Sequence, residues 1–450
     1  MRVYRKTAEL CLSVLLLITA GCAQSAGSGP EQQYPVFRIA LPGIEQQPDS
    51  ERAEEIINEI LREELGAEIE IEAYKYEEYH AQMKKNLARE NDYDILFANN
   101  EMFIENWLSG SYLDITDLIE ENGQGIISAV GRDILDHMKI DGRLFAVTNI
   151  RDYAVTLDTV YLEQGLLDQY GIDPRSITSE ADLEECFARI HAEDPDVLIA
   201  SAVNYFGNEM PCAFLPPLGV LDESGSKYIN YFETEEYLNH LRKLHGWYEK
   251  GWIRAQVSGD TVILDNDHPF ALYRYGKPGG DIETSMTHDG NYTGVLSGAD
   301  VLPAGVYFLS AFAVSSAADS PAMAMRILDL FYTDQRINQA LSEFMYGWTL
   351  PNLFLSEVPE GYPSDLWQQQ KSFNENAVQL PDTGFVFNPA PVMKEYLSAS
   401  EIYQRYRSVL ATGIADPQTA VKRMNEELEE AGLQRIIDEK NRQYKAWRNR

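Results

Sequence analysis

The sequence predicts an α/β protein in which helices cover a largely parallel sheet. Short apolar segments over 36–41, 69–73 and 94–97 have the character of strands, and helical segments separate them. Strands that alternate with helices are typical of a parallel sheet, whose ligands bind beyond the carboxyl ends of the strands. The chain has 450 residues, which is long enough for two lobes with separate cores.

Each early element has its own local signal. Asp49 or Ser50 can cap a helix whose apolar residues between 53 and 61 recur with a period of 3.6. Apolar residues alternate with glutamates over 69–73, which predicts a strand with one face in solvent. The apolar spacing over 79–87 predicts the next helix.

The rest of the chain continues the mixture of strands and helices. We expect strands over 142–147, 154–157, 197–203, 270–275 and 306–314, a hairpin over 220–232, and helices over 181–191, 235–248 and 321–344. From Met393 the pattern is helical to the end, with breaks at 413–417 and at Gly432.

The first 35 residues predict export and anchoring. A basic patch precedes an apolar run from Leu10 to Ile18, which is shorter than the roughly 20 residues of a transmembrane helix and typical of a signal peptide. The segment from Leu17 to Cys22 resembles a bacterial lipobox, so residues 1–21 are predicted to be removed and Cys22 to be lipidated. Residues 22–35 then form a flexible tether. The alternative is an ordinary signal peptide that happens to contain a cysteine.

The charge of the chain limits its partners. It carries 37 Lys and Arg against 71 Asp and Glu, and loss of residues 1–21 lowers the net charge from −34 to −36. Nucleic acid is excluded as a partner because its binding depends on neutralising phosphates. The same acidity opposes adsorption to anionic lipid, so the lipid on Cys22 would do the anchoring.

Catalytic and metal signatures are missing from the sequence. It has no G-x-S-x-G, no H-E-x-x-H and no phosphate-binding glycine loop, and its seven histidines are scattered. We therefore predict no catalytic residue, no metal site and no cofactor. Cys186 and Cys212 are either two buried thiols or one disulfide, which the sequence does not decide.

Aromatic and amide side chains gather at the expected strand ends. A sugar offers an apolar C–H face and an edge of hydroxyl groups, so its site combines flat rings with polar side chains. The candidate ligand contacts are Asn99, Asn100, Glu101, Trp107, Arg151, Asp152, Asn204, Tyr205, Tyr273, Arg274 and Trp348. The alternative for any one ring is packing in the core or at its rim.

The order of several short motifs resembles that of a known family. YDILF at 93–97, GSYLDI at 110–115, KIDGRLFAV at 139–147, WYEKGW at 247–252 and GKPG at 276–279 look like pieces of a family 1 extracellular solute-binding protein, the ligand-capturing lipoprotein of an ABC importer. The tail from 384 to 447 is similar to a C-terminal domain of unknown function in one branch of that family. At Trp348 the chain departs from that branch, which has a Glu-Gly turn there.

The resemblance implies a two-lobed, class II periplasmic-binding-protein-like fold with a hinge and a helical C-terminal region. The N-terminal lobe would contain 36–148 and about 307–347. The C-terminal lobe would contain 149–306 and about 348–450, with 384–450 as its helical domain.

The function implied is capture of a small molecule, chiefly a carbohydrate or oligosaccharide, and its delivery to ABC permease subunits. The protein would be a monomer held by its lipid on the outer face of the cell membrane. The alternatives are a surface enzyme acting on polysaccharides, for which two carboxylates would suffice, and a sensory or adhesive lipoprotein.

Overall fold

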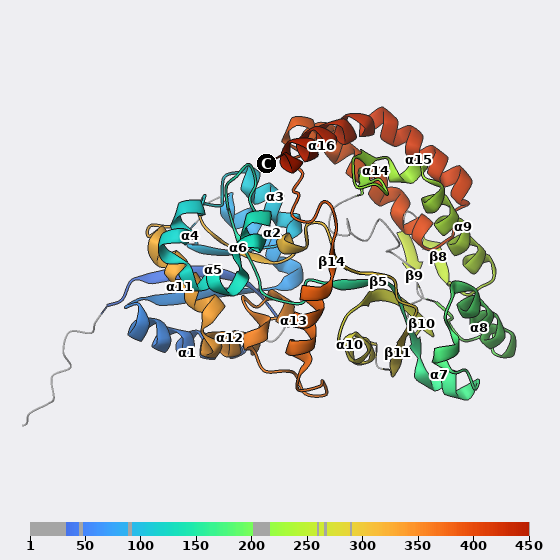
Figure 1. Cartoon of the computed structure of the whole chain (residues 1–450), viewed down its shortest axis with the longest axis horizontal. Helices are drawn as coiled ribbons and strands as arrows, with labels where there is room; N and C mark the ends of the chain where they lie inside the picture. Colours follow the sequence, from blue (N-terminus) through green and yellow to red (C-terminus); the bar gives the residue numbers. More distant parts are fainter. Residues whose placement is uncertain are drawn as a thin grey trace, which may run out of the picture.

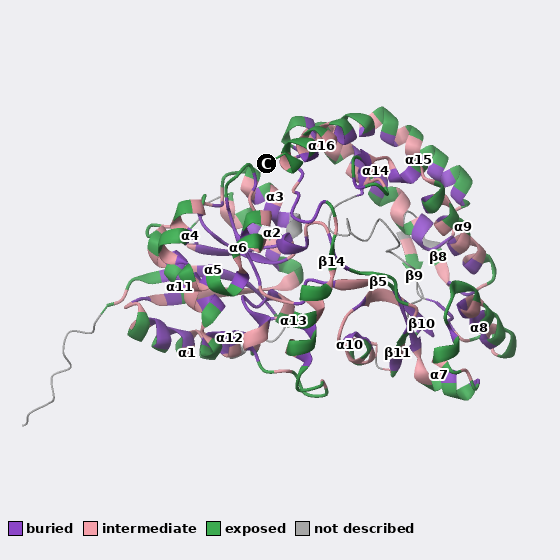
Figure 2. Ribbon diagram, in the orientation of Figure 1, coloured by how far each residue is buried: buried purple, intermediate pink, exposed green. Residues whose placement is uncertain are grey.

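Two five-stranded sheets organise the chain into two lobes that lie side by side (Figure 1). The computed structural model describes residues 33–44, 48–88, 92–200, 217–258, 261–264, 268–288 and 290–449. Each sheet has its own cluster of buried apolar side chains, so the molecule has two cores. In Figure 2 the inner strands of the first sheet are largely buried, whereas the helices turn exposed faces outward.

The first sheet has the strand order β2-β1-β3-β13-β4. β1 (Val36–Gly43) pairs in parallel with β2 (Glu68–Lys75) and β3 (Ile95–Ala98). β13 (Ala311–Val314) runs antiparallel to β3, and β4 (Val147–Thr148) runs antiparallel to β13. The carboxyl ends of four strands and the start of β13 therefore meet at one edge.

Helices enclose this sheet and bury the predicted apolar faces. They are α1 (Pro48–Glu64), α2 (Tyr76–Leu87), α3 (Asn100–Leu108), α4 (Thr116–Asn122), α5 (Gln124–Val130), α6 (Arg132–His137), α11 (Pro321–Thr333) and α12 (Gln335–Ser342). On α1 the side chains of Ala53, Ile57 and Leu61 are fully buried, which confirms the predicted 3.6-residue period.

The second sheet has β5 (Val155–Glu163) at its centre. β10 (Ala271–Gly276), β11 (Tyr292–Val295) and β12 (Asp300–Leu302) pair antiparallel to β5, and β14 (Val378–Gln379) extends β12 in parallel. The accompanying helices are α7 (Gln164–Gln169), α8 (Glu180–Glu193), α9 (Glu235–Glu249), α10 (Gly280–Thr287) and α13 (Leu366–Asn376).

Three C-terminal helices complete the second lobe. α14 (Met393–Ala411), α15 (Pro417–Ala431) and α16 (Leu433–Arg448) form an arc beside α9 (Figure 1), and α14 and α15 contact that helix. The breaks fall where they were predicted, and Gly432 adopts a left-handed φ of 96° between α15 and α16. The buried residues of these helices belong to the core of the second sheet.

Some predicted elements differ from those observed. The predicted helix over 321–344 divides at Asp334, because this residue is extended and its carboxylate caps α12 by accepting a hydrogen bond of 2.8 Å from the backbone N–H of Arg336. Most of 142–147 has no strand partner, since Asp141 and Gly142 form a tight turn with positive φ. The residues 306–308 are a 3₁₀ turn before the short strand β13.

Two other predictions have partial answers. Only a single bridge, at Ala200, is found in the described part of 197–203. The lobe boundaries stay a prediction, and we note that Leu350 and Leu353 pack in the core of the first sheet.

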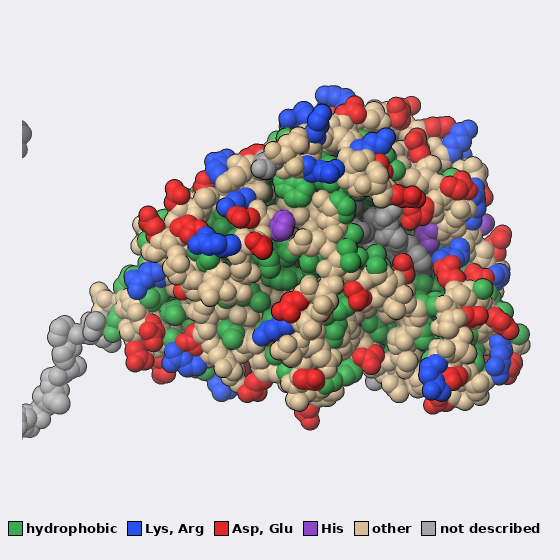
Figure 3. All heavy atoms as spheres, in the orientation of Figure 1, with side chains coloured by type: hydrophobic (Ala, Val, Ile, Leu, Met, Phe, Trp, Pro, Cys, Tyr) green, Lys and Arg blue, Asp and Glu red, His purple; other side chains and the backbone are tan. Residues whose placement is uncertain are grey.

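Surface charge is dispersed. Asp and Glu side chains are spread over the face drawn in Figure 3 and do not gather in one patch. In the part of the chain that the structure describes, every helix is too short or too polar to cross a bilayer.

Candidate functional site

The edge of the first sheet carries polar and aromatic residues directly after its strands. Tyr76 follows β2, Asn99 follows β3, Asn149 follows β4, and Ser310 precedes β13. The strand register places these residues together, because Ala311 pairs with both Ala98 and Thr148. This edge is where an α/β sheet binds its ligands.

Three half-buried rings form an aromatic platform at this edge: Tyr76, Tyr346 and Trp348. The Trp348 ring meets Tyr76 edge to face, with centroids 5.0 Å apart, and is nearly parallel to Tyr346 at 6.3 Å. Asn99 donates a side-chain hydrogen bond of 3.2 Å to the Tyr76 hydroxyl. The platform therefore combines flat apolar faces with an amide, as a sugar site requires.

The backbone beside Trp348 is fixed to the sheet edge. The Ser310 hydroxyl donates to the carbonyl oxygen of Trp348 at 2.9 Å, and the Asn149 amide donates to the carbonyl oxygen of Thr349 at 2.8 Å. Asn149 is fully buried, so this contact replaces water at the point where the chain leaves the first lobe. The position of the indole ring is thus set by hydrogen bonds from two strand ends.

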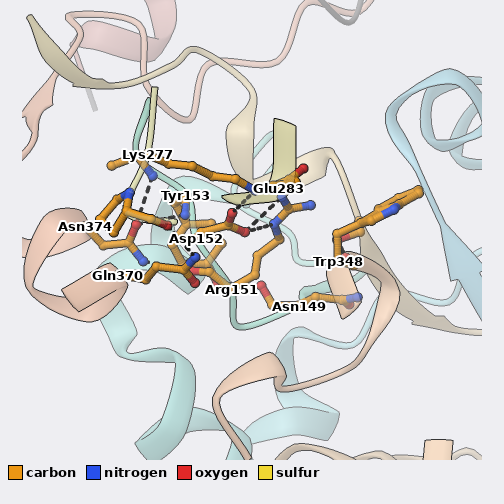
Figure 4. Close-up of polar contacts among 12 residues, drawn as sticks. Asn149, Arg151, Asp152, Tyr153, Lys277, Glu283, Trp348, Gln370 and Asn374 are labelled. Atoms are coloured by element: carbon orange, nitrogen blue, oxygen red, sulfur yellow. Dashed lines mark hydrogen bonds and ion pairs between the residues drawn. The ribbon is translucent and has the colours of Figure 1, made fainter. Parts of the chain in front are cut away.

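A cluster of charged residues lies where the chain passes from β4 of the first sheet to β5 of the second. We call this segment, residues 149–154, the crossing. Asp152 binds the Arg151 guanidinium at 2.9 Å and the Lys277 ammonium at 2.8 Å, and Lys277 also binds Glu283 at 2.6 Å (Figure 4). The Asp152 side chain is only 5 % exposed. We call these four residues the hinge cluster, because they join the crossing at 151–152 to β10 and α10 of the second lobe.

The two cations keep Asp152 ionised. Burial alone would raise the pKa of Asp152, but the charges of Arg151 and Lys277 together lower this pKa to about 2. Burial opposes the charge on Lys277, whereas Asp152 and Glu283 raise the pKa of Lys277 above its usual value. Asp152 and Lys277 are therefore both charged throughout the physiological range.

α13 holds the crossing in place. The Asn374 carbonyl oxygen accepts hydrogen bonds from the backbone N–H groups of Tyr153 (2.8 Å) and Ala154 (2.9 Å), and its amide donates to the carbonyl oxygen of Arg151 at 2.7 Å. One turn earlier, Gln370 donates to the Pro278 carbonyl oxygen at 3.2 Å. Figure 4 shows both amides beside the hinge cluster, with the Trp348 indole directed away from it.

The predicted site residues fall into separate groups. Asn99 and Trp348 lie together at the platform, and Arg151 and Asp152 lie in the hinge cluster. Tyr273 instead borders a cavity within the second lobe. Arg274, the next residue on β10, has its guanidinium 3.2 Å from the Thr287 hydroxyl and 4.0 Å from the Glu283 carboxylate of the hinge cluster.

Other predicted contacts lie elsewhere. Trp107 is two turns beyond the start of α3 and packs against Phe145, with ring centroids 6.1 Å apart. Asn100 and Glu101 begin α3, beside Asn99. Asn204 and Tyr205 lie outside the described residues.

Sequence reasoning missed Tyr76, Lys277, Glu283 and Asn374. Tyr76 lies three residues beyond the strand predicted over 69–73, but the observed strand β2 extends to Lys75 and places Tyr76 directly at its end. Lys277 and Asn374 are recognisable only from their contacts with the crossing, 125 or more residues away, and Glu283 only from its ion pair with Lys277.

Neither the cysteines nor the acidic residues supply a metal site in the described ranges. No group of three or more His, Cys, Asp or Glu side chains there is placed to hold a metal ion. Cys186 is a free thiol within α8, and burial raises its pKa to about 11. Cys212 is outside the described residues.

Comparison with known proteins gives consistent relatives. A family model described as a domain of unknown function (DUF3502) matches residues 381–449. The chain is 23% identical over 472 aligned residues to a carbohydrate ABC transporter substrate-binding protein of Streptococcus pneumoniae serotype 4, which covers 95% of this chain and 93% of the relative.

Solved structures show the same architecture. An N-glycan transport solute binding protein (NgtS) from Streptococcus pneumoniae superposes with a TM-score of 0.76 at 21% identity, covering 92% of this chain and 98% of that one. An ABC substrate-binding protein from Listeria monocytogenes in complex with cycloalternan gives a TM-score of 0.58 at 14% identity, covering 88% and 99%. The fold class and the resemblance predicted from the sequence are confirmed.

Proposed function

We propose that this protein captures an oligosaccharide between its two lobes and delivers it to an ABC importer. The observation that carries the proposal is the aromatic platform, which lies at the ligand-binding edge of the first sheet in a solute-binding-protein fold. The relatives support it, since NgtS has been solved with Man1GlcNAc and with Man5GlcNAc, and a further relative with kestose.

Capture would work by closure of the lobes. A ligand that touches both lobes favours the closed arrangement in proportion to the contacts made only there. The hinge cluster and Asn374 lie at the crossing about which such a movement would take place. Their position supports a hinge between residues 149 and 154.

Calorimetric titration tests the assignment. We expect binding to at least one of Man1GlcNAc, Man5GlcNAc, kestose and cycloalternan, and a loss of at least tenfold in affinity for Trp348→Ala, because a stacked ring contributes up to about 1.5 kcal/mol beyond its buried area. Trp348→Phe should keep most of the affinity. Trp107→Ala is the matched control, since that ring packs on Phe145 and is not one of the three platform rings.

Failure of every oligosaccharide in a broad panel would remove the sugar assignment. Steady release of reducing ends from any of them would favour the polysaccharide-active enzyme instead. If deletion of the gene left uptake intact but abolished a transcriptional response, the sensory alternative would hold.

The anchor is a separate part of the proposal. We expect Cys22 to carry the lipid that holds the protein on the outer face of the membrane near its permease, at high effective concentration. Cys22→Ala should abolish incorporation of labelled palmitate and release the protein into the medium, with ligand affinity unchanged. Labelling that persists in this variant would contradict the anchor.

A further inference from the structure

The second lobe contains a cavity of about 770 Å³. No residue of the hinge cluster or of the platform is among the described residues that line it. Val160 of β5 and Tyr273 of β10 border it from the sheet, and Glu236, His240 and Lys243 border it from α9. Its volume lies in the range of cavities that hold small molecules.

The wall on α9 follows from helical spacing. Glu236, His240 and Lys243 are four and three residues apart, so they share one face of the helix. One turn further on, buried Trp247 contacts the Tyr273 ring, with centroids 5.6 Å apart. The helix wall and the sheet wall are therefore held in a fixed relation.

The cavity is rich in hydrogen-bond acceptors and carries a net negative charge. Asp158, Glu180 and Glu236 border it, and an ionised carboxylate accepts hydrogen bonds but donates none. Among the described residues that border the cavity, the one cation is Lys243, which forms an ion pair with Glu180 and lies 5.5 Å from the Trp247 ring. Burial, and then the nearby Lys243 charge, lower the pKa of His240 to about 3, so His240 adds no positive charge near neutral pH.

The rim of the cavity holds unusual backbone. Asp158 and Leu296 both border the cavity and adopt positive φ angles of 54° and 48°, although neither is glycine. Such conformations are uncommon for residues other than glycine and gather at functional sites. Hydrogen bonds between Leu157 and residues 298–299, at 2.8 and 3.0 Å, hold the two rim segments together.

Chain length limits the separation of the cavity from the platform. Asn149, which binds the backbone beside Trp348, and Asp158 at the cavity rim are nine residues apart. Fully extended, nine residues span at most about 32 Å. An oligosaccharide of several rings has a length of this order, which is compatible with one ligand that touches both surfaces when the lobes close.

We propose that this cavity is the second-lobe half of the oligosaccharide site, and that it accepts uncharged sugar rings and rejects anionic ones. The inference rests on the proposed function. The ring of Tyr273 would lie against a C–H face, and the carboxylates would accept hydrogen bonds from hydroxyl groups. A carboxylate on the ligand would meet three carboxylates and one already paired cation.

The experiment combines a blocking variant with a matched pair of ligands. The neutral probe is Man5GlcNAc, or the panel member that the wild type binds if Man5GlcNAc fails, and the anionic probe is the same sugar with its C6 hydroxyls oxidised to carboxylates. Asn239→Trp places a large ring at the cavity from the exposed side of α9, and Glu249→Trp places the same ring on that helix away from the cavity.

We expect the wild type to bind the neutral probe at least tenfold more tightly than the anionic one, and Glu236→Lys to narrow this ratio at least threefold. Asn239→Trp should lower the affinity for the neutral probe at least tenfold, whereas the affinity of Glu249→Trp for that probe should stay within twofold of the wild-type value.

The outcomes separate the two proposals. Normal binding by Asn239→Trp, together with lost binding by Trp348→Ala, would overturn the cavity assignment and leave sugar capture standing. Equal affinity of the wild type for both probes would overturn the charge selection. Absence of any sugar binding by the wild type would overturn the proposed function and this inference with it. Circular dichroism of each variant distinguishes a blocked cavity from a misfolded lobe.

Discussion

Asp152→Asn tests the electrostatics of the hinge cluster. In the native protein the pKa of Asp152 is about 2, whereas an unperturbed aspartate has a pKa of about 3.8. A difference of this size corresponds to about 2.4 kcal/mol of stability at pH 7, at 1.36 kcal/mol per pKa unit. The substitution also leaves Arg151 and Lys277 without their shared carboxylate, so we expect a total loss of about 3 kcal/mol.

The pH dependence carries a definite sign. A carboxylate whose pKa is lowered by folding stabilises the protein above its unfolded pKa, and this contribution is lost as pH falls from about 4 to about 2. The difference between the wild type and Asp152→Asn should therefore be constant from pH 5 to 7 and shrink by roughly 1 kcal/mol at pH 3. Urea denaturation followed by tryptophan fluorescence at pH 7, 5 and 3 measures it.

The control is another ion-paired aspartate. Asp136 binds Lys139 at 2.6 Å but is largely exposed, so Asp136→Asn should change stability little at any of these pH values. The reasoning is refuted if Asp152→Asn unfolds at the same urea concentration as the wild type at pH 7. It is refuted equally if the difference between them grows at pH 3.

Three further outcomes are expected. Asn374→Ala leaves two backbone N–H groups of the crossing without their acceptor and the Arg151 carbonyl oxygen without its donor, and should cost about 2 kcal/mol, as urea midpoints will show. Gly413→Ala would place a methyl group against the Leu244 carbonyl at a left-handed φ of 70° and should destabilise more than Gly131→Ala, whose methyl group meets open space at φ 92°, in a thermal melt. Sugar affinity should vary less than twofold between pH 5.5 and 8, because His240 stays neutral throughout; a rise in affinity below pH 6.5 would show that this histidine becomes charged.

Much of the first lobe could be predicted because its strands and helices follow from patterns between residues that are close in the sequence. The strand and helix periods of 36–97 determine which faces are buried, and the carboxyl ends of the strands then place Asn99 at the ligand edge. Trp348 was predicted only because its loop, Tyr346-Gly347-Trp348, is rich in aromatic residues. Its partner Tyr76 was missed because it lies between the strand predicted over 69–73 and the helix predicted over 79–87.

The hinge cluster could be predicted only in part. Arg151 and Asp152 are neighbours in sequence and were recognised together, but Lys277 is 125 residues from Asp152. Among 71 acidic residues, no sequence signal distinguishes the one that a distant lysine contacts. Such a pair depends on the tertiary arrangement of β5 and β10.

The cavity could not be predicted from the sequence for a different reason. Glu236, Asn239 and Lys243 look like the solvated face of an amphipathic helix, which is the usual role of such residues. The pattern fails to show that the loop at 296–298 and the start of α8 stand opposite this face. A polar face turned toward a cavity and one turned toward bulk water have the same sequence signature.

The packing of the C-terminal helices has a consequence for how the protein is made. The core of the first sheet draws its residues from 37–154 and 302–353, whereas the core of the second includes Leu428, Ile436 and Tyr444. During synthesis the first core is complete nearly a hundred residues before the second, and domains generally fold as units in the order of synthesis. The second lobe therefore leaves part of its apolar surface uncovered until α16 has been synthesised.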